Sequence, residues 1–173
     1  LERMLDRYGM VYVKPVFGAL GIGVMRVDNT GSGVTLRWGR MRRTFSSLSQ
    51  VYAYILARTK GKPYMVQRGI RLARYRGRPF DIRVMVQRLP RKPWEMTGMA
   101  GRVAAPGKIV TNGSQGGTIY PVSMLVSPRT EKRIRRLSML AARRLHAVFP
   151  GLVQIGLDVA VDRDRRLWII EAN

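Results

Sequence analysis

Acidic side chains and an asparagine lie near the carboxyl end of the chain in a pattern that would suit a metal ion. A hairpin whose turn is centred between Asp164 and Arg165 would place Asp158 directly opposite Glu171. Their Cβ atoms would lie about 4.5–5.5 Å apart, with Asn173 on the same face. Two carboxylates this close repel unless a cation lies between them, and oxygen-only ligands suit Mg²⁺. The alternative is an exposed acidic pair that water solvates or an arginine bridges.

A second feature lies near the amino end, in the stretch VYVKPVFGALGIGVMRV, residues 11–27. Apolar alternation predicts a strand on each side, so Gly18, Gly21 and Gly23 fall where a hairpin turns. These glycines, with Lys14 beside them, favour a backbone flap whose N–H groups bind a polyphosphate. The loop alone is a weak signal, because it is neither a Walker A loop nor a dinucleotide fingerprint. Lys14 could instead be a charge that protects an edge strand.

Taken together, the two features predict a nucleotide triphosphate site. Lys14 would neutralise phosphate charge, and the glycine loop would wrap the β- and γ-phosphates. A Mg²⁺ ion on the acidic hairpin would hold the γ-phosphoryl group. This interpretation requires the two ends of the chain to meet around one ligand.

Composition narrows the possible functions. The net charge is +22, which favours a polyanionic partner, but the cations are spread along the chain and no zinc-finger, RNA-recognition or basic-zipper pattern occurs. Nucleic acid is therefore the less favoured ligand. With no cysteine and His146 as the one histidine, thiol chemistry and histidine-based triads are excluded or nearly so. No leader and no apolar run of about 18 residues occurs, so we expect a cytoplasmic protein without a membrane span.

The elements that must position these residues follow from periodicity and turn signals, and they suggest an α+β fold with mainly antiparallel sheets. In order, we expect the end of a helix over 1–8, strands at 11–13, 24–27, 34–38 and 41–45, a helix from Ser46 or Ser47 to Arg58, a strand at 64–67, a hinge at 68–70, strands at 80–88 and 94–105, a loop over 105–120, a long helix, and strands at 153–161 and 166–171. Both ends look cut, which predicts a piece of a longer polypeptide.

The long helix should begin at Ser127 and Pro128, because serine is a good N-cap and proline suits the first helical position. Its apolar stripe is predicted to contain Ile134, Leu137, Ala141, Leu145 and Val148, and its solvated face Arg129, Arg133, Arg136 and Arg143. Trp94 and Trp168 are expected in the core rather than as stacking platforms.

Five ordered motifs carry a resemblance to a known family. VKPVFGALGIGV, VQRGI, FDIRVMV, TNGSQGG and DVAVDRDRRLWIIEAN occur in the order seen in the ATP-grasp superfamily, over residues 11–173. Within it, QRGIRL, GRPFDIRVMVQ and IVTNGSQGG look most like the endospore coat-associated YheC/YheD-like branch. The resemblance implies an ATP-grasp fold with two α+β lobes that grip ATP, here 1–67 with the glycine loop and 68–173 with the metal site. The family's N-terminal lobe lies outside this segment.

The resemblance also implies a set of ATP-binding residues. Lys14 matches the family's phosphate-binding lysine, and Asp81 matches a residue near the ribose. The family's phosphate loop is matched by Gly18, Gly21 and Gly23. Its adenine-pairing hinge is matched by Arg68, Gly69 and Ile70. Relatives commonly carry a glutamate at the hinge, where this chain has Gln67 and Arg68.

Further matches concern catalysis and the metal. Arg83 matches a basic residue that reaches toward the γ-phosphate or an acyl phosphate, and Arg102 and Asn112 match positions that face phosphate and acceptor. The ligands for Mg²⁺ or Mn²⁺ are matched by Asp158, Glu171 and Asn173. Alternatively, Arg83 pairs with Asp81 on its own strand face, and Asn112 forms only a turn.

The implied activity is that of a carboxylate–amine ligase, which uses ATP and Mg²⁺ to form an acyl phosphate that an amine attacks. Its carboxylate substrate and amine acceptor are unknown, and the basic surface favours an acidic polymer or peptide in the spore coat. One alternative is a non-catalytic, ATP-binding structural or assembly protein of the spore coat. The other is a basic nucleic-acid-binding domain.

Overall fold

The computed structural model describes residues 1–18, 20–111 and 116–173, which form two compact units. The first unit contains Leu1–Ile70 and the described part of the segment 106–115. The second contains Arg71–Ala105 and Gly116–Asn173. Each unit has a hydrophobic core of its own.

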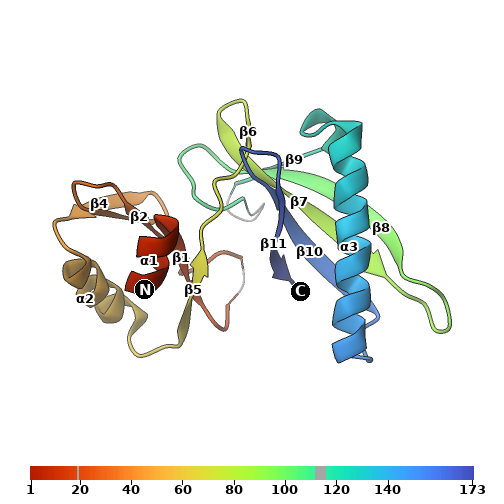
Figure 1. Ribbon diagram of the computed structural model, residues 1–173, viewed down its shortest axis with the longest axis horizontal. Helices are drawn as coiled ribbons and strands as arrows, with labels where there is room; N and C mark the ends of the chain where they lie inside the picture. Colours follow the sequence, from red (N-terminus) through yellow and green to blue (C-terminus); the bar gives the residue numbers. More distant parts are fainter. Residues whose placement is uncertain (19, 112–115) are drawn as a thin grey trace. The chain divides into compact units, whose positions relative to one another are not determined.

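The first unit is an antiparallel sheet with two helices on one face (Figure 1). Its strand order is β4-β3-β2-β1-β5. The elements are α1 (Glu2–Tyr8), β1 (Met10–Pro15), β2 (Met25–Asn29), β3 (Val34–Trp38), β4 (Met41–Phe45), α2 (Leu48–Thr59) and β5 (Tyr64–Arg68). Leu5 of α1 and Val51 and Ile55 of α2 pack on alternate strand residues such as Val11 and Val27. The other face of the sheet is therefore left to the polar residues between them.

The second unit is a second antiparallel sheet, with the long helix α3 along one face (Figure 1). Its strand order is β11-β10-β7-β8-β9, and β6 pairs with β7. The elements are β6 (Arg74–Tyr75), β7 (Arg78–Gln87), β8 (Glu95–Val103), β9 (Thr118–Tyr120), the 3₁₀ turn η2 (Val122–Met124), α3 (Pro128–Val148), β10 (Gln154–Val161) and β11 (Leu167–Ala172). Ile134 of α3 packs against Ile82, Val84 and Leu157, so the alternate residues of β7 and β10 face away from α3. Across the described ranges, no helix combines the length and apolar character needed to cross a membrane.

Several predicted boundaries are confirmed, because local capping chemistry sets them. The N-cap of α2 is Ser47, whose hydroxyl accepts the backbone N–H of Gln50 at 3.4 Å. The N-cap of α3 is Ser127, which accepts the N–H of Thr130, also at 3.4 Å, and Pro128 follows it. Strands β3 and β4 have the predicted bounds. The predicted burial of Trp94 and exposure of the α3 arginines are also confirmed.

Other predictions are wrong. Val148 is 68% exposed, because the buried stripe of α3 runs through Thr130, Ile134, Ser138 and Ala142. Two of these residues carry hydroxyl groups, which a search for apolar positions passes over. The short strand β6 was not predicted, and β9 lies inside the predicted loop over 105–120. Strands this short are defined by their partners rather than by their own periodicity.

The hairpin of β10 and β11 pairs Asp158 with Glu171, as predicted, but its turn is centred on Asp164 and not between Asp164 and Arg165. Val161 pairs with Leu167, and the register shifts between Asp158 and Val159. Leu167 therefore packs on the core, and Trp168, which was expected there, is only half-buried.

Asp162 is the physical reason for this turn. One carboxylate oxygen, Oδ1, accepts the backbone N–H groups of Asp164 and Arg166 at 2.9 and 2.8 Å. The other, Oδ2, accepts the indole N–H of Trp168 at 2.9 Å. Burial raises the pKa of Asp162, but the three hydrogen bonds and the charge of Arg166 together lower it by more, so the net pKa is below the ordinary value. The ionised carboxylate is thus the form that holds the turn.

We predict that Asp162→Ala lowers the free energy of unfolding by about 2 kcal/mol, because three donors lose their acceptor. Urea unfolding followed by tryptophan fluorescence measures the loss. Since folding lowers the pKa of Asp162, its contribution is complete above the unfolded-state value of about 4 and is lost as the pH falls through the folded value. The difference between the two proteins should therefore shrink in acid.

Asp164→Ala is the matched control, because Asp164 is exposed and lies 3.6 Å from Arg166. A loss no larger than that of the control would contradict the role of Asp162.

Candidate functional site

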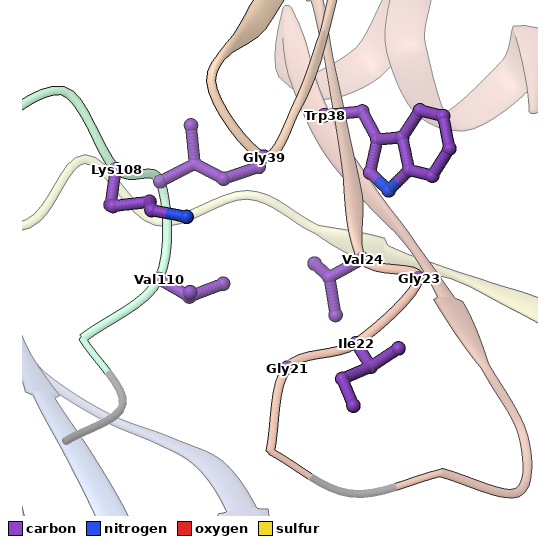
Figure 2. A pocket seen from close by; sticks show the side chains of 9 residues that line it. Gly21, Ile22, Gly23, Val24, Trp38, Gly39, Lys108 and Val110 are labelled. Atoms are coloured by element: carbon purple, nitrogen blue, oxygen red, sulfur yellow. The ribbon is translucent and has the colours of Figure 1, made fainter. Parts of the chain in front are cut away.

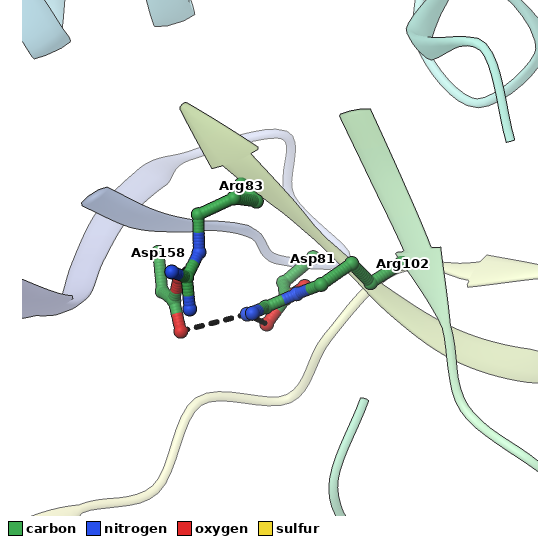
Figure 3. A network of polar contacts seen from close by, with 4 residues as sticks. All are labelled: Asp81, Arg83, Arg102 and Asp158. Carbon is green, nitrogen blue, oxygen red and sulfur yellow. Dashed lines mark hydrogen bonds and ion pairs between the residues drawn. The ribbon is translucent and has the colours of Figure 1, made fainter. Parts of the chain in front are cut away.

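Four charged side chains meet on the face of the second sheet that points away from α3 (Figure 3). Arg83 on β7 lies directly opposite Asp158 on β10. Asp81, two residues earlier on β7, lies directly opposite Arg102 on β8. Residues opposite each other on paired strands share a face, so the strand order β10-β7-β8 brings all four together.

Arg102 is the centre of this network. Its guanidinium binds both carboxylate oxygens of Asp81, with Nε–Oδ1 at 2.8 Å and Nη2–Oδ2 at 2.7 Å. The same Nη2 lies 2.7 Å from Oδ2 of Asp158, and Nε of Arg83 lies 2.6 Å from Oδ1 of Asp158. Asp81, Asp158 and Arg102 are 2%, 6% and 9% exposed. The two negative carboxylates and the two positive guanidinium groups have a net charge of zero. Proteins tolerate buried charges when they are paired in this way.

The two carboxylates of the network favour the charged form of Arg102. Burial lowers the pKa of Arg102, but the hydrogen bonds and charges of Asp81 and Asp158 raise it more, so the net pKa is above the ordinary value. The contact between Arg83 and Asp158 is an ion pair without hydrogen-bond geometry, which leaves the buried Oδ1 of Asp158 without a hydrogen-bond donor. A guanidinium group thus lies beside each carboxylate oxygen of Asp158, so a metal ion bound there would share these oxygens with Arg83 and Arg102 or replace them.

The other two predicted metal ligands lie beside Asp158. Glu171 is directly opposite it on β11. Asn173 pairs with Gly156 through two backbone hydrogen bonds of 2.8 and 2.9 Å, which places it on the same face. Within the described residues there is no group of three or more His, Cys, Asp or Glu that could hold a metal. The set of Asp158, Glu171 and Asn173 has only oxygen ligands among its side chains, so it fits a hard cation such as Mg²⁺, and metal binding there stays a prediction.

The network corrects one sequence interpretation. Arg83 does not pair with Asp81 on its own strand; it pairs with Asp158, and Asp81 pairs with Arg102. The sequence analysis considered that an arginine bridges an exposed pair of Asp158 and Glu171. Arginines do compensate Asp158, but its carboxylate is buried. The ion pair of Arg102 with Asp158 was missed, because no local pattern connects β8 to β10. The predicted contact of Asp81 with ribose stays a prediction, and both of its carboxylate oxygens bind Arg102 in this structure.

In the first unit, the glycine loop joins β1 to β2. Gly21 and Gly23 have left-handed backbone angles, with φ of 70° and 77°, and Gly18 does not. The left-handed backbone at Gly23 favours glycine, and a Cβ there would also lie 2.9 Å from the hydroxyl of Tyr64, which would have to shift. Lys14 lies on β1 opposite Met65, just before the loop. These positions agree with a phosphate loop, and phosphate binding is untested.

The predicted hinge begins at the end of β5. The guanidinium of Arg68 lies 4.6 Å from the ring centre of Tyr8. The N–H of Gly69 donates to the carbonyl of Met10 at 2.9 Å, and a Cβ there would lie 2.5 Å from the Met10 side chain. Ile70 ends the first of the two chain segments in this unit, so all three residues are near the unit boundary. Asn112 lies outside the described residues. Whether the residues of the two units meet around ATP stays a prediction.

A pocket of about 200 Å³ lies within the first unit (Figure 2). The glycine loop lines it together with Trp38, Gly39 and the segment 108–110. The hydroxyl of Tyr12 donates to the carbonyl of Ile109 at 3.2 Å and holds this segment on the unit. Lys108 is a pocket residue that the sequence analysis missed, although its charge within a glycine-rich loop was a usable signal.

Comparison with solved structures defines the fold class as α+β and ATP-grasp-like. D-alanyl-alanine synthetase A from Vibrio cholerae aligns with a TM-score of 0.61 and 11% identity, over 99% of this chain and 44% of that one. N5-carboxyaminoimidazole ribonucleotide synthetase from Thermotoga maritima aligns with a TM-score of 0.52 and 12% identity, over 100% of this chain and 34% of that one. At these identities the likeness concerns the fold.

The family model described as YheC/D like ATP-grasp matches residues 1–173, so the chain belongs to this family. One curated relative is the endospore coat-associated protein YheD of Bacillus subtilis strain 168. It is 27% identical over 184 residues, which cover 100% of this chain and 41% of the relative. The chain thus spans about two fifths of that relative's length.

We predict that Arg102→Ala lowers the free energy of unfolding by about 3–5 kcal/mol, because Asp81 and Asp158 stay buried with less compensation. Arg135→Ala is the matched control. It removes an exposed 2.7 Å pair with Glu131 and should cost less than about 1 kcal/mol. Urea unfolding of both variants makes the comparison. Equal losses would show that the network does not stabilise the fold.

Proposed function

We propose that this chain is the ATP- and Mg²⁺-dependent part of a carboxylate–amine ligase that works through an acyl phosphate. The observation that supports this most is the buried, charge-balanced network on β7, β8 and β10, because it orients Asp158 beside Glu171 and Asn173. Membership of the ATP-grasp family, whose members are typically ATP-dependent ligases that use Mg²⁺, supports it further.

In this proposal, residues 1–67 carry the phosphate loop and residues 68–173 carry the metal ligands. Lys14 and the loop amides near Gly21 and Gly23 would bind the phosphates of ATP. Asp158, Glu171 and Asn173 would hold Mg²⁺, which when bound supplies positive charge at the phosphates. The backbone of residues 68–70 would contact adenine, and Asp81 is the candidate for the ribose side.

The proposed reaction has two steps. The substrate carboxylate attacks the γ-phosphorus, which forms an acyl phosphate and releases ADP; an amine then attacks the carbonyl carbon, which forms an amide and releases phosphate. Arg83 is half-buried, with 34% of its side chain exposed, so its guanidinium can stabilise charge on the transferred phosphoryl group. Arg102, with Asp81 behind it, is a positioning residue for Asp158. Asn112 is proposed to face the acceptor.

A second candidate is a non-catalytic, ATP-binding structural or assembly protein of the spore coat. The similarity to YheD, an endospore coat-associated protein, favours it. Both candidates would act in the cytoplasm of the sporulating cell and at the coat. Plain nucleic-acid binding is the third candidate and rests on charge alone; it predicts steep salt dependence and indifference to Mg·ATP.

We predict that Glu171→Gln weakens Mg²⁺-dependent ATP binding at least tenfold, about 1.4 kcal/mol, because one of two metal-binding carboxylates is lost. Glu171 is exposed, so the fold should be preserved. Titration calorimetry with Mg·ATP measures the effect. The control is Glu95→Gln, an exposed glutamate at the start of β8. Unchanged Mg·ATP affinity in the Glu171 variant would overturn the metal assignment.

Turnover separates the ligase from the non-catalytic binder. For a ligase, we expect release of ADP and phosphate only when a carboxylate substrate and an amine acceptor are both supplied. A panel of acidic peptides and amines, assayed by coupled ADP detection, provides the readout. For a binder, Mg·ATP should raise the melting temperature without ADP release under any condition of the panel.

A further inference from the structure

The polar face of the first unit's sheet carries a row of arginines. Arg26 on β2 lies directly opposite Arg37 on β3, and Arg37 lies directly opposite Arg42 on β4. On its other side Arg26 lies opposite Tyr12 on β1. Residues that face each other across paired strands share one face, so the three arginines form a line across the sheet. We call Arg26, Arg37 and Arg42 the arginine row.

The row lies on the face that the helices do not cover. The residues next to it along the strands, Val27 and Leu36, are in the core under α1 and α2. Because side chains alternate along a strand, the arginines point to the opposite face. Tyr12 is on that face too, and its hydroxyl holds Ile109 there.

Charge compensation along the row is incomplete. Arg26 has a partner, since its Nε lies 2.8 Å and its Nη2 2.5 Å from the carboxylate oxygens of Asp28. Burial lowers the pKa of Arg26, but the hydrogen bonds and charges of Asp28 and Tyr12 together outweigh it, so the net pKa is raised. In the part of the chain that the structure describes, no carboxylate forms an ion pair with Arg37 or Arg42. The Nε of Arg37 is buried without a hydrogen-bond partner.

Protection of an exposed sheet edge explains only part of this arrangement. β4 is an edge strand, and cations on edge strands prevent association with other sheets, which accounts for Arg42. Arg37 is on an interior strand and is half-buried, so edge protection does not account for it. Like charges directly opposite each other destabilise a sheet, and a buried N–H without an acceptor adds to the cost. An anionic ligand would remove both penalties.

We propose that the arginine row binds a polycarboxylate chain, in the form of an acidic peptide segment. A guanidinium group matches a carboxylate in a bidentate geometry. Adjacent strands are about 4.8 Å apart, so the row suits two or three carboxylates within about 10 Å. The row contains none of the proposed metal ligands, and it lies on the same sheet face as Lys14, which is two residues from Tyr12 on β1.

The surroundings of the row favour a peptide over a single-stranded nucleic acid. Non-specific single-strand binding uses exposed aromatic side chains on which bases stack. On the described strands, Tyr12 is the aromatic residue of this face, and its hydroxyl is engaged with Ile109. Trp38 and Phe45 belong to the opposite face, where Arg58 and Arg43 lie over their rings at 3.6 and 5.0 Å.

The test uses fluorescein-labelled octaglutamate and fluorescence anisotropy with the full chain. Arg37→Gln combined with Arg42→Gln should weaken binding at least about tenfold, because the bidentate contacts are lost. The matched control is Arg133→Gln combined with Arg136→Gln on the exposed face of α3, which removes the same charge. We expect the control to weaken binding less than about threefold. Equal losses in the two double variants would overturn the proposal, since binding would then follow net charge alone.

Three further arms keep the result unambiguous. Arg42→Gln alone changes an exposed residue, so this variant should fold even where the double variant is unstable. A several-fold loss of octaglutamate affinity in it supports the site, and an unchanged affinity overturns the proposal. Octathymidylate should bind more weakly than octaglutamate and should be insensitive to the row substitutions; tighter, row-dependent binding would overturn the peptide in favour of nucleic acid. Mg·ATP affinity should change less than about threefold in the row variants; a loss as large as the loss of octaglutamate binding would overturn the peptide in favour of a row that serves the nucleotide phosphates. Failure of the row is thereby separated from failure of the ATP proposal.

Discussion

Sharing of Arg102 between Asp81 and Asp158 is the interaction on which the arrangement of the candidate site depends. The arginine comes from β8, and the two aspartates come from β7 and β10, so one guanidinium joins three adjacent strands. None of these side chains is stable in the protein interior by itself, because a buried charge without a partner is costly. The network therefore requires the register of the sheet and also holds it. Its consequence is an oriented Asp158 beside Glu171 and Asn173, which is the basis of the proposed metal chemistry.

The arginines of this chain have different physical roles, although composition shows them only as a net charge of +22. Arg102 is buried in ion pairs, and Arg58 lies over the ring of Trp38 at 3.6 Å. The arginines of α3 are exposed to solvent. Arg37 lies on an interior strand without a carboxylate partner in the described residues. A basic composition thus identifies a class of partner, but the structural setting of each arginine decides whether it stabilises the fold or is available to a ligand.

Fold and family contribute different kinds of evidence about function. The solved ligases share the architecture at 11% and 12% identity, which establishes the arrangement of strands and helices and leaves the chemistry to the site residues. The YheC/D-like family covers the whole chain, and the YheD relative connects that family to the endospore coat. The side chains at a site decide which substrate and acceptor it binds. The functional proposals therefore rest on the acidic hairpin, the glycine loop and the arginine row.

The sequence by itself determined the features that depend on near neighbours. The pairing of Asp158 with Glu171 was predicted, but in the structure it also depends on the register shift. Serine caps began α2 and α3, and strand patterns and turn signals bounded β3 and β4. These features follow from periodicity and capping, whose physical causes lie within a few residues. Only the tertiary structure decided that Arg102 reaches Asp158, that the register shifts after Asp158, and that β9 pairs with β8. Those contacts join segments that are distant along the chain, and the order of strands in a sheet is settled by the burial of its whole face, which no local pattern encodes.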